Sequence, residues 1–312
     1  MRIGLVVDSA CDLPQDFCEE HGIIILPVTV HVGNEEFVDR RDPAATLEFY
    51  RRHLTNAAHA ETAPLSVEQI KDLFLQRLVL DYDFVFCQTV ASSRSPIFEH
   101  ATQASLTILS EYKAVRARAN IQGPFALRVI DSQNLFAAQG VLAVETARMI
   151  GEGLMPNRIR ERIDNLIPNL YLYGLPSDLY HLRARANKKG DKSVGWFKYA
   201  LGSAFDMKPV IRGHRGETAS VASIRHFDEG SKRLCHFVAE RIRGGLLTPT
   251  LCVTYAGDLE KLEKLPGYQE LKMVAQEYRV KLYTSVASIT ACINIGEGAL
   301  AFAFCAPEHE FK

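Results

Sequence analysis

The first 150 residues alternate between two patterns of hydrophobic and polar positions. Short apolar runs bounded by polar or turn-forming residues are typical of buried strands, and they occupy residues 3–8, 22–32, 81–90 and 126–132. Segments with apolar residues at helical spacing lie between or after them, at residues 42–54, 66–79, 95–112 and 134–150. This alternation predicts a mainly parallel sheet with helices on both faces.

Local signals support three of these helices. Asp42 and Pro43 form a helix-start pair at the beginning of the first helical segment. Ser66 is an N-cap residue for the next segment and is followed by Glu68 in the first turn. Residues 134–150 are apolar nearly all round, which predicts a helix buried inside the domain.

The pattern changes near residue 165, where strands become more frequent. Apolar runs predict further strands at residues 169–176, 208–224 (two strands around a Gly-containing turn), 248–257, 279–286, 289–296 and 298–306. Helical spacing predicts helices at residues 227–242 and 258–279. We therefore predict two α/β domains, residues 1–165 with the mainly parallel sheet and residues 166–312 with a mixed sheet and helices.

Size, charge and cysteine usage narrow the class of protein. A chain of 312 residues is too long for one ordinary core, which agrees with two domains. A net charge of -1 argues against a nucleic-acid binder, which needs a basic face. The sequence has no run of about 18 apolar residues and no signal-peptide pattern. The seven cysteines are scattered and odd in number, so we expect reduced thiols and a cytoplasmic location with at most transient membrane contact.

Standard catalytic and metal-binding motifs are missing from the sequence. It contains no G-x-G-x-x-G, no H-E-x-x-H and no G-x-S-x-G elbow. The ten histidines show no metal-ligand spacing. We therefore predict no catalytic residue, no metal and no cofactor.

Loops rich in small hydroxyl residues follow the predicted strands. They are residues 8–12, 59–66, 89–95, 129–134 and 294–298. In an open α/β sheet, ligands collect beyond the carboxyl ends of the strands. Hydroxyl groups and loop N–H groups can hold an anionic oxygen there without a full cation. The alternative is helix capping, which is the commonest role of Ser, Thr and Asp at such positions.

Five of these segments, taken in order, resemble motifs of the DegV family. Residues 6–14 (VVDSACDLP) resemble the family's V-T-D-S-T-A-D-L-P, and residues 62–66 (TAPLS) resemble its T-S-Q-P-S loop. Residues 90–101 lie where the family has S-S-x-L-S-G-T-Y-x-x-A. The last two matches are to V-I-D-S-x-x-x-x-x-G-x-x-x-x-x-A and H-T-G-P-G-A-L-G, at residues 129–150 and 294–304. The order and spacing agree over essentially the whole chain.

The resemblance implies a fold and a function. Best-understood members are fatty-acid-binding subunits of bacterial fatty acid kinase, in which an apolar tunnel between the two α/β domains holds the acyl chain. A separate kinase subunit then phosphorylates the carboxylate for phospholipid metabolism, and the carrier itself is non-catalytic. Carried over to this chain, the residues that hold the carboxylate are Thr62, Ser92 or Ser93, and Asn294.

The chain departs from the family pattern at several positions. Asn294 stands where the family has a histidine, and residues 94–97 replace the L-S-G-T turn. Arg94 is either a new cation for the head group or a solvated loop residue, and Ser95 beside it is a further candidate. Two residues are candidates for partner docking. The resemblance implies Arg225, and Arg183 is the second, just before the segment that replaces the family's G-G-R-I run.

Two hypotheses remain open from the sequence. The first is a carrier that binds a long-chain fatty acid and presents its carboxylate to a kinase-type partner. The alternative is an enzyme or small-molecule sensor on the same scaffold with a more polar ligand, because fold alone does not fix function. For Asp8 and Ser9 we expect a role in capping and ordering the loop that follows them, with direct ligand contact as the second choice.

Overall fold

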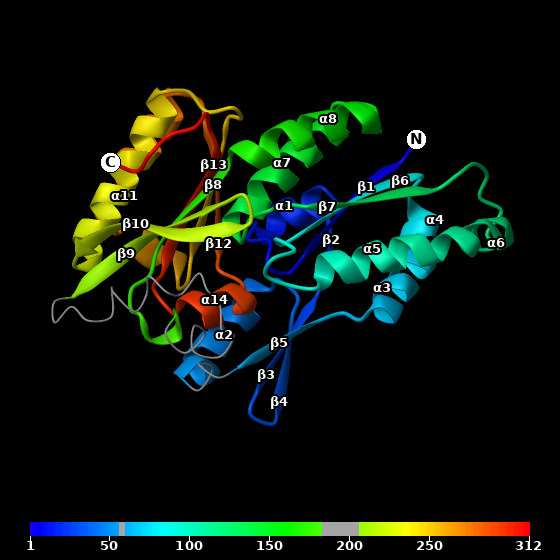
Figure 1. Cartoon of the computed structure of the whole chain (residues 1–312), viewed down its shortest axis with the longest axis horizontal. Helices are drawn as coiled ribbons and strands as arrows, with labels where there is room; N and C mark the ends of the chain where they lie inside the picture. The colour runs from blue at the N-terminus through cyan, green and yellow to red at the C-terminus, as the bar shows by residue number, and fades with distance from the viewer. Residues whose placement is uncertain (56–59, 183–205) are drawn as a thin grey trace.

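The computed structural model describes residues 1–55, 60–182 and 206–312, and within them the strands form three sheets (Figure 1). The first sheet is entirely parallel and has the order β2-β1-β6-β7. Its strands are β1 (Ile3–Asp8), β2 (Ile24–Leu26), β6 (Phe84–Thr89) and β7 (Ala126–Asp131). The parallel sheet predicted for the first half of the chain is therefore confirmed.

The second sheet is mixed, as predicted for the second half of the chain. Its order is β10-β9-β8-β13-β11-β12, with β11 and β12 parallel and the other neighbours antiparallel. The strands are β8 (Leu170–Leu175), β9 (Met207–His214), β10 (Glu217–Arg225), β11 (Thr250–Tyr255), β12 (Lys281–Val286) and β13 (Leu300–Cys305). The strands β9 and β10 form the hairpin predicted around a glycine-containing turn.

A small antiparallel sheet of order β4-β3-β5 was not predicted. It consists of β3 (Val28–Val32), β4 (Glu35–Asp39) and β5 (Glu61–Pro64). The single strand predicted at residues 22–32 is wrong, because the chain leaves the parallel sheet at Pro27, which has no backbone N–H to donate. Thr62 consequently lies in a strand and not in the predicted loop.

Eight helices accompany the first and third sheets in the described part of the chain. They are α1 (Gln15–Glu20), α2 (Pro43–His53), α3 (Val67–Leu73), α4 (Val79–Asp81), α5 (Ile97–Thr107), α6 (Tyr112–Arg118), α7 (Ala137–Gly151) and α8 (Pro156–Leu166). Asp42 and Ser66 cap α2 and α3 as predicted, and a π-helical turn continues α3 into α4.

Helix α7 lies between the two larger sheets (Figure 1) and contacts strands of both, namely β1, β6, β8, β11 and β13. Nearly all of its side chains are buried, as its apolar pattern predicts. Gly140 permits the close approach, because a Cβ atom there would lie 2.9 Å from the carbonyl oxygen of Asp12 and 3.2 Å from the sulfur of Cys252. The helix thus joins the parallel sheet to the mixed sheet.

The helices of the second half are α11 (Phe227–Arg243), α12 (Leu259–Leu262), α13 (Tyr268–Glu277) and α14 (Ile289–Ile295). The long helix predicted at residues 258–279 is interrupted, because Gly267 has a left-handed φ of 86°. The strand predicted at residues 289–296 is wrong, since this segment is α14. Ser288 begins the helix by accepting a hydrogen bond from the N–H of Ala291, and short apolar runs do not distinguish a strand from a buried helix.

Two clusters of buried apolar side chains share the mixed sheet. The larger cluster extends from the parallel sheet through α7 to one face of the mixed sheet, where it includes Leu172 and Ala303. The smaller cluster lies on the other face, where Tyr173 packs against Phe237 of α11 and side chains of α13 complete the cluster. Neighbouring residues of β8 therefore serve different cores. The division into domains 1–165 and 166–312 stays a prediction.

Candidate ligand-binding site

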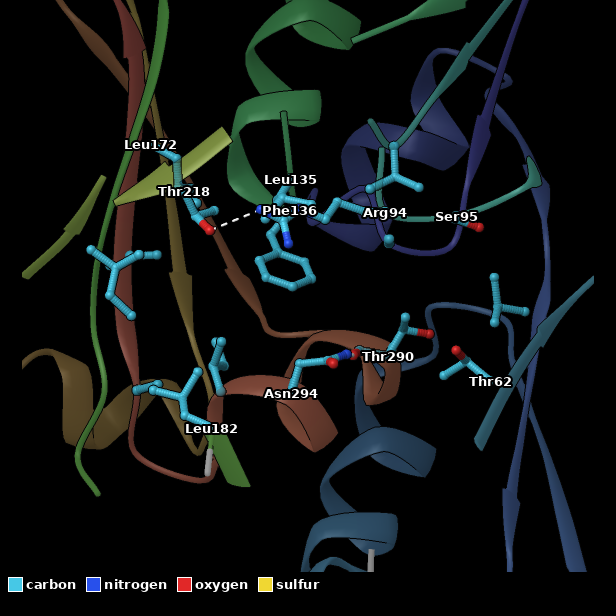
Figure 2. Close-up of a pocket in the computed structure, with 18 of the residues that line it drawn as sticks. Thr62, Arg94, Ser95, Leu135, Phe136, Leu172, Leu182, Thr218, Thr290 and Asn294 are labelled. Atoms are coloured by element: carbon cyan, nitrogen blue, oxygen red, sulfur yellow. Dashed lines mark hydrogen bonds between the residues drawn. The ribbon is translucent and has the colours of Figure 1, made fainter. Parts of the chain in front are cut away.

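A cavity of about 270 Å³ lies where the loops after β1, β6 and β7 meet the mixed sheet, the small sheet and α14 (Figure 2). Its lining side chains come from segments that are far apart in the sequence, from Asp8 to Ala301. Leucine and isoleucine side chains of the mixed sheet lie on one side, and the hydroxyl and amide side chains of Thr62, Ser95, Thr290 and Asn294 lie across from them, with Val28, Val90 and Ile97 among the latter. We call these two parts of the cavity the apolar wall and the polar end.

The apolar wall is built mainly by three strands of the mixed sheet. Its residues are Leu172 of β8, Ile211 of β9 and Ala301 of β13. Leu175 and Leu300 also line the cavity, although both belong to the apolar cluster on the other face of the sheet. Gly174 also lines the cavity and pairs with Ala301 across the strands, so this part of the wall carries almost no side-chain bulk. The wall offers a ligand apolar surface only, because its backbone N–H and C=O groups are already paired within the sheet.

The polar end contains Thr62 of β5, Ser95, Thr290 and Asn294 (Figure 2). Ser95 accepts a hydrogen bond from the N–H of Ile97 at 3.3 Å, so its O–H remains able to donate. The structure therefore brings together three residues that the sequence singled out, Thr62, Ser95 and Asn294. Hydroxyl and amide groups at such a place can bind the oxygens of a ligand head group.

Sequence reasoning missed Thr290, because residues 289–296 were assigned to a strand. In α14, Thr290 and Asn294 lie one turn apart on the same face, and the Nδ2 of Asn294 donates to the carbonyl oxygen of Thr290 at 2.6 Å. The N–H and the hydroxyl of Thr290 both donate to Asp39, at 3.1 Å and 3.2 Å. Helical spacing would have identified Thr290 had the cap at Ser288 been recognised.

Buried charges hold α14 beside the small sheet. Arg41, only 7% exposed, contacts the carboxylate of Asp12 at 3.2 Å and donates to the carbonyl oxygen of Val286 at 2.9 Å. Asp12 also accepts from the N–H of Ser288, and Asp39 accepts from the N–H of Arg41. Burial raises the pKa of Asp12 to about 6 despite the nearby guanidinium, and it also raises the pKa of Asp39. This network fixes the start of α14, and hence the polar end.

Asp8 and Ser9 are buried and connect the loops around the cavity. Asp8 accepts hydrogen bonds from the N–H groups of Ala10 at 2.9 Å and Val90 at 2.6 Å, and its burial raises its pKa to about 6. Ser9 accepts from the N–H of Val28 at 3.1 Å, at the start of β3. These contacts order the loops after β1 and β6. Asp8 also lines the cavity, whereas Ser9 is not among its lining residues.

The two candidate serines after β6 point to different partners. The hydroxyl of Ser92 donates to Asp131, and Ser92 is exposed and does not belong to the cavity lining. Ser93 does line the cavity, and its hydroxyl donates to the carbonyl oxygen of Gly216 at 2.8 Å, in the β9–β10 turn. Of the pair, the structure brings only Ser93 to the site.

Arg94 lies in the cavity lining and not in solvent. It is partly buried, and its Nη2 donates to the hydroxyl of Thr218 in β10 at 2.9 Å (Figure 2). Sequence reasoning missed Thr218, although it lies in the predicted hairpin strand. Arg94 therefore brings a cation to the cavity lining, and its role toward a head group stays a prediction.

The residues predicted for partner docking lie away from the cavity lining. Arg225 is exposed at the end of β10. Arg183 lies outside the described residues. Its role and that of Arg225 stay predictions.

Three chemical features complete the description of the site. Within residues 1–55, 60–182 and 206–312, no group of three or more His, Cys, Asp or Glu side chains has a metal-binding arrangement. All seven cysteines are described, buried and free of disulfides. Burial raises the pKa of thiols such as Cys18, to about 11, which disfavours the nucleophilic thiolate.

Comparison with known proteins identifies the family. Residues 2–307 match the family model described as "Uncharacterised protein, DegV family". The chain belongs to the DegV family. A DegV domain-containing protein of Xanthomonas campestris pv. campestris is 52% identical over 313 residues, covering 100% of both chains.

Solved structures share the DegV fold at lower identity. A DegV protein from Bacillus subtilis, described as a fatty acid binding protein, has a TM-score of 0.75 at 21% identity, covering 98% of this chain and 99% of that one. A stearic-acid-binding protein from Eubacterium ventriosum has a TM-score of 0.78 at 20% identity, covering 97% and 98%. These matches confirm the predicted fold class.

Within residues 1–55, 60–182 and 206–312, no helix combines the length and the apolar character that a membrane crossing requires.

Proposed function

We propose that this DegV protein binds a long-chain fatty acid, with the acyl chain along the apolar wall and the carboxylate at the polar end. The observation that carries the proposal is the two-sided cavity, with leucine and isoleucine side chains opposite Thr62, Ser95, Thr290 and Asn294. The fatty acids bound by the structural neighbours from Bacillus subtilis and Eubacterium ventriosum support the same ligand class.

The two parts of the cavity contribute differently to binding. Burial of an acyl chain yields about 0.8 kcal/mol per methylene, so a 16-carbon tail supplies most of the affinity even after the entropy of association is subtracted. The hydroxyl groups of Thr62 and Ser95 contribute about 1 kcal/mol each and mainly orient the head group, whereas the hydroxyl hydrogen of Thr290 is donated to Asp39. Arg94 adds a cation to the cavity, on the side of the mixed sheet, where its guanidinium donates to Thr218.

The proposal extends to how the ligand is used. The protein acts as a non-catalytic carrier without cofactor in the cytoplasm, and presents the carboxylate from a tunnel between its two domains to a kinase-type partner. Three features support this role: the absence of standard catalytic motifs from the sequence, the buried thiols, and an exposed Arg225 suited to docking an acidic or phosphate-bearing surface.

The test is mass spectrometry of organic extracts from the purified protein, followed by titration of delipidated protein with palmitate and stearate. A co-purified fatty acid and saturable binding at one site per chain are expected. A polar metabolite in place of a fatty acid would support the alternative, an enzyme or sensor with a more polar ligand. Phosphorylation of the bound acid by a fatty acid kinase subunit tests the partner separately.

A further inference from the structure

Phe136 has an unusual backbone conformation at the cavity. It precedes α7 with φ 48° and ψ −120°, a region that glycine adopts readily and that a residue with a Cβ atom adopts only with steric strain. Strained residues persist where the surrounding structure holds them, and they concentrate at binding sites.

Hydrogen bonds on both sides hold the strained turn in place. The side chain of Asn134 donates to the carbonyl oxygens of Leu170 at 3.0 Å and Gly213 at 3.2 Å, and accepts from the N–H of Leu135. On the other side, the N–H of Asp12 lies 3.4 Å from the carbonyl oxygen of Phe136. The turn is thus tied to the mixed sheet and to the loop after β1, and its backbone cannot relax alone.

The side chain of Phe136 projects into the cavity. Figure 2 shows the ring below the start of α7, between the leucine side chains of the apolar wall and the side of the cavity that carries Thr62 and Ser95. Phe136 is 8% exposed, so the protein itself covers most of the ring. An acyl chain that runs from the polar end along the wall has to pass or stop at this ring.

We propose that Phe136 is the specificity-determining residue for the acyl chain, and that its ring limits the length of chain the cavity accepts. The inference rests on the proposed fatty-acid binding. Glycine would satisfy the turn without strain, so the conformation of the backbone does not by itself require an aromatic residue. The ring fills volume that a longer chain would otherwise occupy.

The experiment compares acyl-chain profiles of delipidated wild-type protein, Phe136→Ala and Phe125→Ala, using saturated acids from 12 to 20 carbons. Phe125 is a matched control because it is also a buried phenylalanine, 5% exposed, but lies outside the cavity lining beside Tyr112. In Phe136→Ala the ratio of affinities for 18-carbon over 14-carbon acid should rise at least tenfold. Each additional buried methylene is worth about fourfold in affinity. Phe125→Ala should keep the wild-type profile.

The outcomes separate the two proposals. An unchanged chain-length profile in folded Phe136→Ala would overturn the role of Phe136 while leaving fatty-acid binding intact. Failure of the wild-type protein to bind any of the acids would overturn the proposed function. Phe136→Leu, which keeps a large apolar side chain, guards against loss of folding and should shift the same ratio in the same direction by a smaller factor.

Discussion

The apolar wall and the polar end of the cavity are built in opposite ways. The wall comes from adjacent strands of one sheet, β8, β9 and β13, whose backbone hydrogen bonds hold it without help from side chains. The polar end collects Thr62, Ser95 and Asn294 from three separate elements. Buried hydrogen bonds and the charges of Asp12, Asp39 and Arg41 keep the α14 part of it in place. We therefore expect the wall to tolerate substitution and the polar end to depend on single contacts.

The largest effect should come from removing the buried cation. Arg41→Ala is expected to lower the free energy of unfolding by about 3–5 kcal/mol, because Asp12 and Asp39 lose the charge that compensates their burial. Urea denaturation of both proteins measures this difference in the free energy of unfolding. The control is Arg52→Ala, which removes an exposed pair with Glu48 and should leave stability unchanged. A loss below about 1 kcal/mol for Arg41→Ala would show that the polar end does not depend on this network.

The pH dependence of the free energy of unfolding should reveal the raised pKa of Asp8. Its pKa of about 6 lies above the value of about 3.9 in an unfolded chain, so between these values the folded protein holds a proton that the unfolded chain releases. Stability relative to Asp8→Asn should therefore fall as pH rises from 4 to 7, by about 2–3 kcal/mol. Denaturation of both proteins at four pH values measures this difference. Parallel pH profiles would contradict a buried, protonated Asp8.

Thr62→Val tests the head-group side without changing size. We expect fatty-acid binding to weaken by roughly 1–3 kcal/mol with little change in stability, through loss of one hydrogen bond. Calorimetric titration with palmitate measures it. Thr102→Val is the control, since that hydroxyl bonds to the carbonyl oxygen of Phe98 on α5 and lies outside the cavity lining. Equal affinity for Thr62→Val and wild type would leave Thr62 with a purely structural role.

Asn294→His should strengthen carboxylate binding only below about pH 6.5, where histidine gains charge. Asn294 lies on α14 and still faces the cavity, although the predicted strand there is wrong. A charged hydrogen bond is worth about 1–2 kcal/mol more than a neutral one. The affinities of wild-type protein and Asn294→His for palmitate, measured at pH 6 and pH 8, test this prediction. The same ratio of affinities at both pH values would place the head group away from Asn294.

Arg225→Ala should have the smallest effect on the isolated protein. Because Arg225 is exposed and lies outside the cavity lining, the melting temperature and the content of bound fatty acid should stay unchanged. Phosphorylation of bound acid by a kinase partner should fall. A drop in melting temperature of several degrees would instead assign Arg225 to a structural ion pair.

Sequence patterns predicted the parts of the fold that local periodicity controls. The parallel strands, the β9–β10 hairpin and the burial of α7 follow from apolar runs and helical stripes. The small sheet escaped prediction because two of its strands are short and mostly polar or partly exposed, as in β4 and β5. Residues 289–296 were misassigned because an apolar run of this length suits a strand or a buried helix equally well.

The sequence by itself determined the composition of the site's loops and the apolar strands that became the wall. Only the tertiary structure decided which candidates face the cavity, since Ser92 turns to Asp131 while Ser93 and Arg94 reach the β9–β10 hairpin. It also added Thr290 and Phe136, which no motif marked. The physical reason is distance along the chain. Hydrophobic periodicity carries information only about residues a few positions apart in the sequence. The contact that orders the polar end joins Ser288 to Asp12, 276 positions apart.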